Sequence, residues 1–157
     1  MSEKVKGSMF TGGKSKLSER QIDDFYATPE QTTRKLLDKI ELKGSILECA
    51  CGQGHISKVL KEYYPENKII STDIVDRGYA DEIKDFLKDE FDNVDTVITN
   101  PPFKYAKEFV EKGLEVANDK VIMLLKIQFL ENFSRILLLN IYMCLAKDKA
   151  LWKMEYL

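Results

Sequence analysis

The sequence lacks the features that hold a chain in a membrane or stabilise it outside the cell. Three cysteines among 157 residues are an odd number and do not indicate a disulfide framework. The longest nearly apolar run, residues 136–146, is too short for a membrane span, and we expect it to form a buried helix. The first residues show no basic start followed by an apolar stretch and a cleavage site. We therefore expect a cytoplasmic protein without membrane contact.

Positive charge is scarce in the middle of the chain. The net charge is −2, but residues 21–103 carry 10 Lys or Arg against 17 Asp or Glu. Residues 1–20 carry 5 against 2, and residues 104–157 carry 9 against 7. A protein that grips a long duplex usually has a broad basic face. Any nucleic-acid contact is therefore expected at the ends of the chain and at a local patch.

The chain also lacks internal repeats and low-complexity segments, and its length suits one domain with one core. Residues 1–20 are polar, contain Gly and Ser, and have no apolar period, so we expect a flexible N-terminal arm. Residues 21–157 are expected to form the single folded domain.

Apolar residues in that domain alternate between strand and helix patterns. Strands are expected at 45–49, 68–73, 94–100 and 120–126, helices at 55–64 and 104–117, and a helix or loop at 81–91. The helix at 104–117 should bury Phe109, Val110 and Leu114. This alternation indicates an α/β fold with a parallel sheet, in which ligands bind beyond the carboxyl ends of the strands.

A further helix is expected before the first strand. Thr28, Pro29 and Gln31 fit an N-cap, a first helical proline and a capping-box glutamine. The apolar positions expected to form the buried stripe of this helix are Leu36, Leu37 and Ile40.

Glu48, Gly52 and Gly54 lie in the stretch LECACGQGHIS, where the first expected strand ends. Two glycines at this turn let the backbone approach a ligand and leave helix N–H groups free to face it. The stretch is not a P-loop, because no Gly-Lys-Ser/Thr follows, and it lacks the third glycine of a dinucleotide fingerprint. The acid instead favours a ligand with a positively charged amino group.

Asp73 ends the second expected strand, 19 residues after Gly54. A carboxylate at this place can accept hydrogen bonds from both hydroxyls of a ribose, as it does in dinucleotide-binding folds. The glycine turn and the acid, each at a strand end, are together stronger evidence for such a ligand than the turn alone.

Cys49, Cys51 and His55 could suggest a metal site. A structural zinc site normally has four ligands, and the remaining cysteine, Cys144, lies in the apolar run. We therefore expect no metal. Cys49 and Cys51 fit small, partly buried turn residues, and His55 fits the first turn of a helix without a catalytic role.

The stretch TNPPF, residues 99–103, ends the third expected strand. Pro101 and Pro102 fix the backbone in an extended turn and remove two N–H donors. The Asn100 side-chain oxygen and the Pro101 carbonyl could accept hydrogen bonds from one exocyclic amine, while Phe103 offers a face to a planar ring. Such acceptors would free the lone pair of the amine for attack, which is the chemistry of N-methylation. For an isolated NPP, a strand terminator beside a packed aromatic is the alternative.

Taken in order, these motifs resemble those of class I S-adenosylmethionine-dependent methyltransferases, specifically the N6-adenine DNA methyltransferases of phage and bacterial genomes. FYATP resembles the N-terminal cofactor segment, LECACGQGH the glycine loop, STD the ribose acid, KDFL the segment beside the cofactor's adenine, and TNPPF the catalytic (D/N)PP(Y/F) signature. The resemblance covers residues 24–130. It implies a Rossmann-like fold with a mostly parallel sheet and helices on both faces.

The resemblance also implies a role for each matched position. The residues that would contact S-adenosylmethionine are Tyr26, Thr28, Glu48, Ala50, Gly52, Gly54, Asp73, Ile74, Asp85 and Phe86, with Asp73 on the ribose and the last two at the adenine. The residues that would act on the target are Asn100, Pro101, Pro102 and Phe103, with Phe103 stacked on an adenine flipped out of DNA. Transfer would depend on orientation and hydrogen bonding, without a general base or a metal.

The C-terminal part departs from the resemblance. Only 27 residues follow residue 130, whereas such enzymes usually continue through strands that complete a seven-stranded sheet. We therefore expect a sheet that is incomplete at its C-terminal strands, with room for one helix and a short strand. We also expect this apolar segment to pack on a partner, such as another copy of the chain. The apolar residues concerned are Leu137, Leu138, Leu139, Ile141 and Trp152.

Three functions are compatible with these motifs. The first is methylation of adenine N6 in DNA. The second keeps the cofactor and changes the acceptor to an RNA base or a protein glutamine, because loops of this kind resemble those of such enzymes as well. The third is a non-catalytic chain that binds the cofactor or a partner. The FYATP start and the absence of a recognisable RNA-binding module favour DNA.

Overall fold

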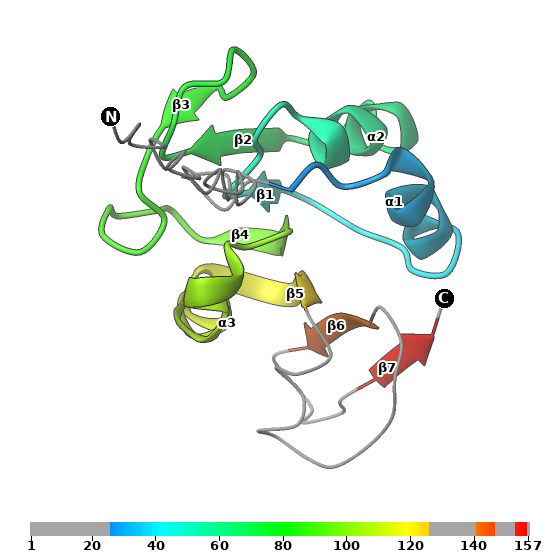
Figure 1. Cartoon of the computed structure of the whole chain (residues 1–157). Coiled ribbons are helices and arrows are strands. Elements are labelled where there is room, and N and C mark those ends of the chain that lie inside the picture. Colours follow the sequence, from blue (N-terminus) through cyan, green and yellow to red (C-terminus); the bar gives the residue numbers. More distant parts are fainter. Residues whose placement is uncertain (1–25, 126–140, 147–152, 157) are drawn as a thin grey trace, which may run out of the picture.

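A computed structural model describes residues 26–125, 141–146 and 153–156 (Figure 1). The arm expected at residues 1–20 lies outside the described residues, as do four of the apolar residues expected to contact a partner, Leu137, Leu138, Leu139 and Trp152. The fifth, Ile141, is described as part of a strand, and its side chain is not described. In the described part of the chain, no helix is long and apolar enough to cross a bilayer.

The described residues form three α-helices, one 3₁₀ turn and seven strands. The helices are α1 (Glu30–Leu37), α2 (His55–Tyr63) and α3 (Ala106–Val116), with a 3₁₀ turn, η1 (Phe103–Tyr105), directly before α3. The strands are β1 (Ile46–Glu48), β2 (Ile69–Asp73), β3 (Glu82–Ile83), β4 (Val94–Thr99), β5 (Ala117–Leu125), β6 (Ile141–Ala146) and β7 (Lys153–Tyr156).

The strands form one sheet in the order β3-β2-β1-β4-β5-β6-β7. Strands β1 to β5 are parallel, β6 is antiparallel to β5, and β7 is antiparallel to β6. This confirms the predicted α/β class with a mostly parallel sheet. The order reverses at β1, because the chain runs outward to β2 and β3 and then returns to the other side of β1. Ligands of open parallel sheets bind beyond the carboxyl ends of the strands at such a reversal.

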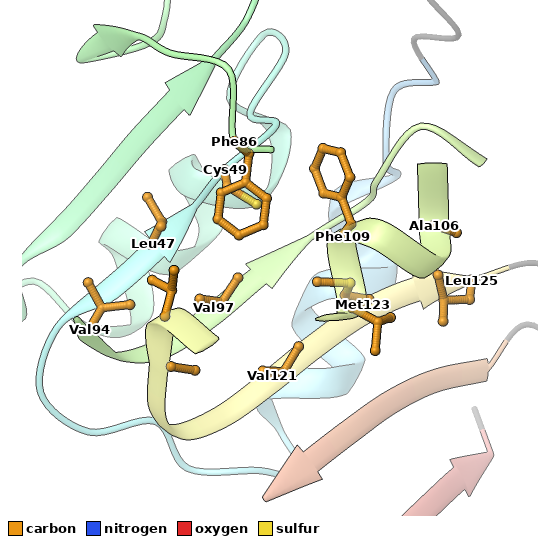
Figure 2. Close-up of a cluster of buried hydrophobic side chains, with 13 residues drawn as sticks. Leu47, Cys49, Phe86, Val94, Val97, Ala106, Phe109, Val121, Met123 and Leu125 are labelled. Carbon is orange, nitrogen blue, oxygen red and sulfur yellow. The ribbon is translucent and has the colours of Figure 1, made fainter. Parts of the chain in front are cut away.

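Helices cover both faces of the sheet, as predicted, because neighbouring residues of each strand point to opposite faces. Ile46, Ile98 and Ile122 face α1 and α2 and belong to one buried cluster. On the other face, Leu47 pairs with Val97, which pairs with Val121, and this row packs with α3 in a second cluster. Figure 2 shows this second cluster, in which Phe109 of α3 and Phe86 lie over the strands.

Most of the predicted buried helical positions are correct, and one position on α3 is not. Phe109 and Val110 are buried as expected, but Leu114 is 37% exposed and Gly113 is buried instead. A Cβ atom at Gly113 would lie 3.0 Å from Met123 of β5. Helix α3 therefore approaches β5 so closely at this point that its buried stripe passes through a glycine.

The predicted start of α1 is wrong. The helix begins at Glu30, and Pro29 is the N-cap residue, without a side-chain cap hydrogen bond. Thr28 is 4% exposed and lies one position too early to cap the helix. Leu36 and Leu37 form the buried stripe, whereas Ile40 lies beyond the end of the helix and is only partly buried.

Two other segments form strands that the sequence did not predict. Residues 81–91 contain the short strand β3, which pairs with β2 through Thr72 and Glu82. The helix expected at 136–146 is wrong for Ile141–Ala146, which is strand β6 and pairs with β5. With β7, the sheet reaches seven strands, so the expectation of missing C-terminal strands is also wrong. Ile and Tyr favour strands, and an apolar run alone does not distinguish a strand from a buried helix. The pairing with β5 shows that this segment is a strand.

Candidate active site

One cavity of about 560 Å³ lies at the carboxyl ends of β1, β2 and β4, in the size range of pockets that bind small molecules. Most of the residues predicted from the sequence line it. These are Tyr26, Thr28, Glu48, Ala50, Asp73, Ile74, Asp85, Phe86, Asn100, Pro101 and Pro102. Gly52, Gly54 and Phe103 are not part of the cavity wall, although each lies next in sequence to a residue that is.

Asn100 follows β4 and is held by the segment before α1. Its side-chain NH2 donates hydrogen bonds to the Tyr26 carbonyl (3.1 Å) and to the Thr28 hydroxyl (3.2 Å). These contacts fix the orientation of the amide. In the part of the chain that the structure describes, its buried Oδ1 has no hydrogen-bond partner. Buried carbonyl oxygens are normally satisfied, so this oxygen is an acceptor that the described chain leaves unpaired.

Asp73 ends β2 and orients the glycine turn. One carboxylate oxygen accepts a hydrogen bond from the Gly52 N–H at 2.7 Å, and the other accepts one from the Val75 N–H at 2.9 Å. The Gly52 N–H is therefore engaged by Asp73. The expectation that the helix N–H groups are free to face a ligand is wrong for Ser57, whose N–H donates to Glu48. Asp73 is 7% exposed, and its carboxylate needs these donors to remain buried.

Gly54 is the N-cap residue of α2 and has a φ of 77°, which favours glycine. Its N–H is also engaged, because it donates to the Cys51 carbonyl at 2.8 Å. The ring of Tyr79 lies directly over it, since a Cβ atom at Gly54 would be 2.3 Å from that ring. The amines of Lys58 and Lys61 each lie 5.2 Å from the centre of the same ring.

Glu48 is almost fully buried at the end of β1 and is held by Ser57. Its Oε2 accepts hydrogen bonds from the Ser57 N–H (2.8 Å) and from the Ser57 hydroxyl. The Ser71 hydroxyl lies 2.7 Å from that of Ser57 and extends this network under the cavity. Burial raises the pKa of Glu48 to about 8. The carboxyl is therefore mostly neutral at pH 7, which modifies the prediction of a charged acid at this position.

Ile74, Asp85 and Phe86 form another part of the cavity wall. Ile74 is 61% exposed, which is high for a large apolar residue. Asp85 accepts a hydrogen bond from the Leu87 N–H (3.0 Å) and pairs with Lys88 (2.8 Å), which lowers the pKa of the Asp85 carboxyl. Phe86 is buried, and its ring packs on that of Phe109 in the core.

Phe103 begins η1, and its ring packs on that of Tyr26, with 5.5 Å between the ring centres. Tyr26 is 53% exposed and lines the cavity, so this aromatic pair lies at the cavity rim. The segment before α1 therefore contacts the NPPF stretch twice, through the Tyr26 ring and through the hydrogen bonds of Asn100.

Cys49 and Cys51 are free thiols with 2% and 3% exposure, more deeply buried than expected. Burial raises the pKa of the Cys49 thiol well above its usual range and that of Cys51 to about 12. Among the residues that the structure describes, no group of three His, Cys, Asp or Glu side chains could hold a metal ion. His55 lies in the first turn of α2, as expected, and lines the cavity.

Sequence reasoning missed two residues at the rim. Lys104 and Tyr105 both line the cavity, and Tyr105 is 42% exposed. The Tyr105 N–H donates to the Pro102 carbonyl (2.9 Å), which fixes η1 directly after the NPPF stretch. The sequence feature that could have identified these two residues is a second aromatic residue, Tyr105, two positions after Phe103 and next to a lysine.

No protein-family model and no curated protein matches the chain. Solved structures do share its fold. A dimethyladenosine transferase from Plasmodium falciparum superposes with a TM-score of 0.54 at 20% identity, covering 71% of this chain and 46% of that protein. TrmN from Thermus thermophilus gives 0.52 at 16% identity, with coverages of 74% and 44%.

Human N-acetylserotonin methyltransferase, in a complex with S-adenosylmethionine, gives a TM-score of 0.50 at 17% identity, with coverages of 59% and 33%. The chain has the Rossmann-like class I methyltransferase fold. It spans less than half the length of each of these three structures.

Proposed function

We propose that the chain is an S-adenosylmethionine-dependent methyltransferase that methylates the exocyclic N6 amine of adenine in DNA. The observation that carries this proposal is the state of the Asn100 amide. Its NH2 is engaged by Tyr26 and Thr28, while its Oδ1 has no partner in the described chain, at a cavity formed by strand ends. An oriented acceptor of this kind suits an amine N–H.

The cavity fits the proposed cofactor. Asp73 has an oriented carboxylate for ribose hydroxyls, and Ile74 has an exposed apolar side chain that a flat ring can cover. Glu48 lines the same cavity, and its carboxyl could accept a hydrogen bond from the amino group of the cofactor. When bound, S-adenosylmethionine supplies a methyl group on a positively charged sulfonium. A neutral amine can attack such a group without prior deprotonation.

The residues after β4 would prepare the amine. Oδ1 of Asn100 and the carbonyl of Pro101 would each accept one N–H, which draws the conjugated nitrogen toward tetrahedral geometry and frees its lone pair. Phe103 would hold the adenine ring by stacking. These are effects of orientation and of hydrogen bonds that are already in place, which can contribute a large part of a rate enhancement.

Adenine is supported as the target by the resemblance of the TNPPF stretch to the catalytic signature of adenine methyltransferases. One structural neighbour is named a dimethyladenosine transferase, which also points to an adenine ring. An RNA base is the second candidate acceptor, because loops like TNPPF resemble those of enzymes that act on RNA. A protein glutamine is the remaining acceptor, because its side-chain amide presents an NH2 group as well.

Calorimetry with S-adenosylmethionine, followed by parallel transfer assays on DNA, RNA and protein, tests the proposal. We expect binding, and transfer that yields N6-methyladenine among the nucleosides of DNA, identified by mass analysis. Product in RNA alone or on glutamine alone would replace the DNA assignment. Binding with no transfer to any acceptor would support a non-catalytic chain instead.

A further inference from the structure

The rim of the cavity carries exposed aromatic side chains next to the residues proposed to hold the target. Tyr105 is 42% exposed and Tyr26 is 53% exposed, and both line the cavity that contains Asn100. Tyr26 also packs on Phe103. Exposed aromatic faces stack on nucleobases, at a gain of roughly 1–3 kcal/mol for each base.

The positively charged side chain of Lys104 lies beside the Tyr105 ring. The Lys104 amine lies 5.1 Å from the centre of the Tyr105 ring, and Lys104 also lines the cavity. Other lysines of the wall are paired, Lys84 with Glu82 at 3.2 Å and Lys88 with Asp85 at 2.8 Å. Within residues 26–125, Lys104 forms no ion pair with a carboxylate. An aromatic ring beside an unpaired cation matches the base and the phosphate of one nucleotide.

The charge of the described domain argues against a duplex as the bound form. Residues 26–125 carry 14 Lys or Arg and 19 Asp or Glu. Duplex DNA has one phosphate charge for about every 1.7 Å of helix axis, so its binding usually requires many cations. Base faces inside a duplex are covered by their neighbours, whereas in an unpaired strand they are open to aromatic side chains.

We propose that the acceptor enters as an unpaired nucleic-acid strand, and that Tyr105 and Lys104 contact a nucleotide next to the target adenine. This inference rests on the proposed function for the identity of the target. Beyond the proposed function, it states that the substrate is single-stranded at the site. The rim residues should therefore bind single strands more tightly than duplexes. Single-stranded DNA and single-stranded RNA both present open bases and phosphates, so the two are tested separately.

Fluorescence anisotropy measures the selection without requiring turnover. One adenine-containing sequence is labelled and titrated as single-stranded DNA, as single-stranded RNA and as duplex DNA, with S-adenosylhomocysteine present. We expect at least one single strand to bind more tightly than the duplex. Equal or tighter binding of the duplex would overturn the inference.

Variants at the rim test the assigned residues. Tyr105→Ala should weaken single-strand binding about fivefold or more, whereas Tyr105→Phe should retain it. Tyr63→Ala is the matched control, because Tyr63 is 37% exposed and does not line the cavity. Lys104→Ala should reduce the salt dependence of log K by about 0.7. Lys43→Ala, before β1 at the opposite edge of the sheet, should not change it.

Two results separate this inference from the proposed function. Single-strand preference without methyl transfer to any acceptor would leave the inference standing and remove the proposed function. Transfer to duplex adenine that equals or exceeds transfer to the single strand would remove the inference and leave the proposed function. Wild-type binding by both Tyr105→Ala and Lys104→Ala, with thermal melting that shows both to be folded, would also overturn the inference.

Discussion

The side-chain NH2 of Asn100 lies 3.2 Å from the hydroxyl oxygen of Thr28, 72 positions earlier in the chain. This contact joins the segment before α1 to the carboxyl end of β4. It also determines which end of the Asn100 amide is engaged, because an NH2 held in place leaves the oxygen for a ligand. The segment matched to cofactor binding and the NPPF stretch are therefore linked by a polar contact as well as by proximity.

Removing the Thr28 hydroxyl should slow methyl transfer more than it weakens cofactor binding. Thr28→Val keeps the shape of a residue that is 4% exposed and removes one acceptor of the Asn100 amide. A net hydrogen bond contributes about 0.5–1.5 kcal/mol, so we expect the single-turnover rate to fall roughly twofold to tenfold. Thr28→Ser should restore the rate. A larger loss of cofactor affinity than of rate in Thr28→Val would contradict this role.

Asn100→Ala should nearly abolish transfer and leave the affinity for S-adenosylmethionine close to that of the wild type. The variant removes the free oxygen proposed to accept the amine, and Ala introduces no bulk into the cavity. Single-turnover transfer and calorimetry measure the two quantities separately. Substantial transfer by this variant would remove Asn100 from the proposed mechanism.

Asp73→Ala should show the opposite pattern and weaken cofactor binding first. The carboxylate accepts the N–H groups of Gly52 and Val75, so its loss leaves two backbone donors without partners and loosens the turn. Leaving buried donors unsatisfied costs about 1–3 kcal/mol, so we also expect a lower free energy of unfolding in urea. If Asp73→Ala kept its cofactor affinity while Asn100→Ala lost it, the two assignments would be exchanged.

The sequence correctly predicted which polar residues lie at the carboxyl ends of the strands, because the signals for the end of a strand are local. Glu48, Asp73 and Asn100 each follow a short apolar run, and the rule that parallel strands end at one edge brings them to one cavity. This rule locates the carboxyl edge of the sheet without any distances between the three residues.

Contacts between distant segments could not be predicted in this way. Thr28 fits an N-cap locally, and its bond to Asn100 appears only when the fold brings the two segments together. Residues Ile141–Ala146 form a strand through pairing with β5, which an apolar run alone does not reveal. The buried bonds of Ser57 to Glu48 and Ser71 likewise join α2 to β1 and β2.

A side chain at Gly54 should disturb the glycine turn through two separate effects. Gly54→Ala places a Cβ atom 2.3 Å from the Tyr79 ring and imposes a φ of 77° on a residue that disfavours it. The backbone effect alone is expected to cost about 1 kcal/mol. We expect lower stability and weaker cofactor binding.

The double variant Gly54→Ala/Tyr79→Ala separates these two effects. Removing the ring relieves the clash and leaves the backbone strain, so the double variant should be more stable than expected from the two single variants. Urea unfolding of the four proteins gives the coupling between the two positions. Additive losses would show that the Tyr79 ring moves aside at no cost.

The buried Glu48 carboxyl should make the protein less stable as the pH rises. Its pKa is about 8 in the folded chain, against an ordinary value of 4.5, because burial disfavours the charged form. Between these values the folded state keeps a proton that the unfolded state has lost. The contribution of Glu48 to stability is therefore fully present below pH 4.5 and is lost as the pH rises toward 8.

The matched variant Glu48→Gln isolates this contribution, because glutamine keeps an oxygen that can accept from Ser57 and does not titrate. Each pH unit in the window should lower the free energy of unfolding of the wild type relative to the variant by up to about 1.4 kcal/mol. Urea unfolding of both proteins at several pH values between 4.5 and 8 measures the difference. Because all other titrating groups are common to both chains, parallel pH curves would mean that Glu48 is charged in the folded protein.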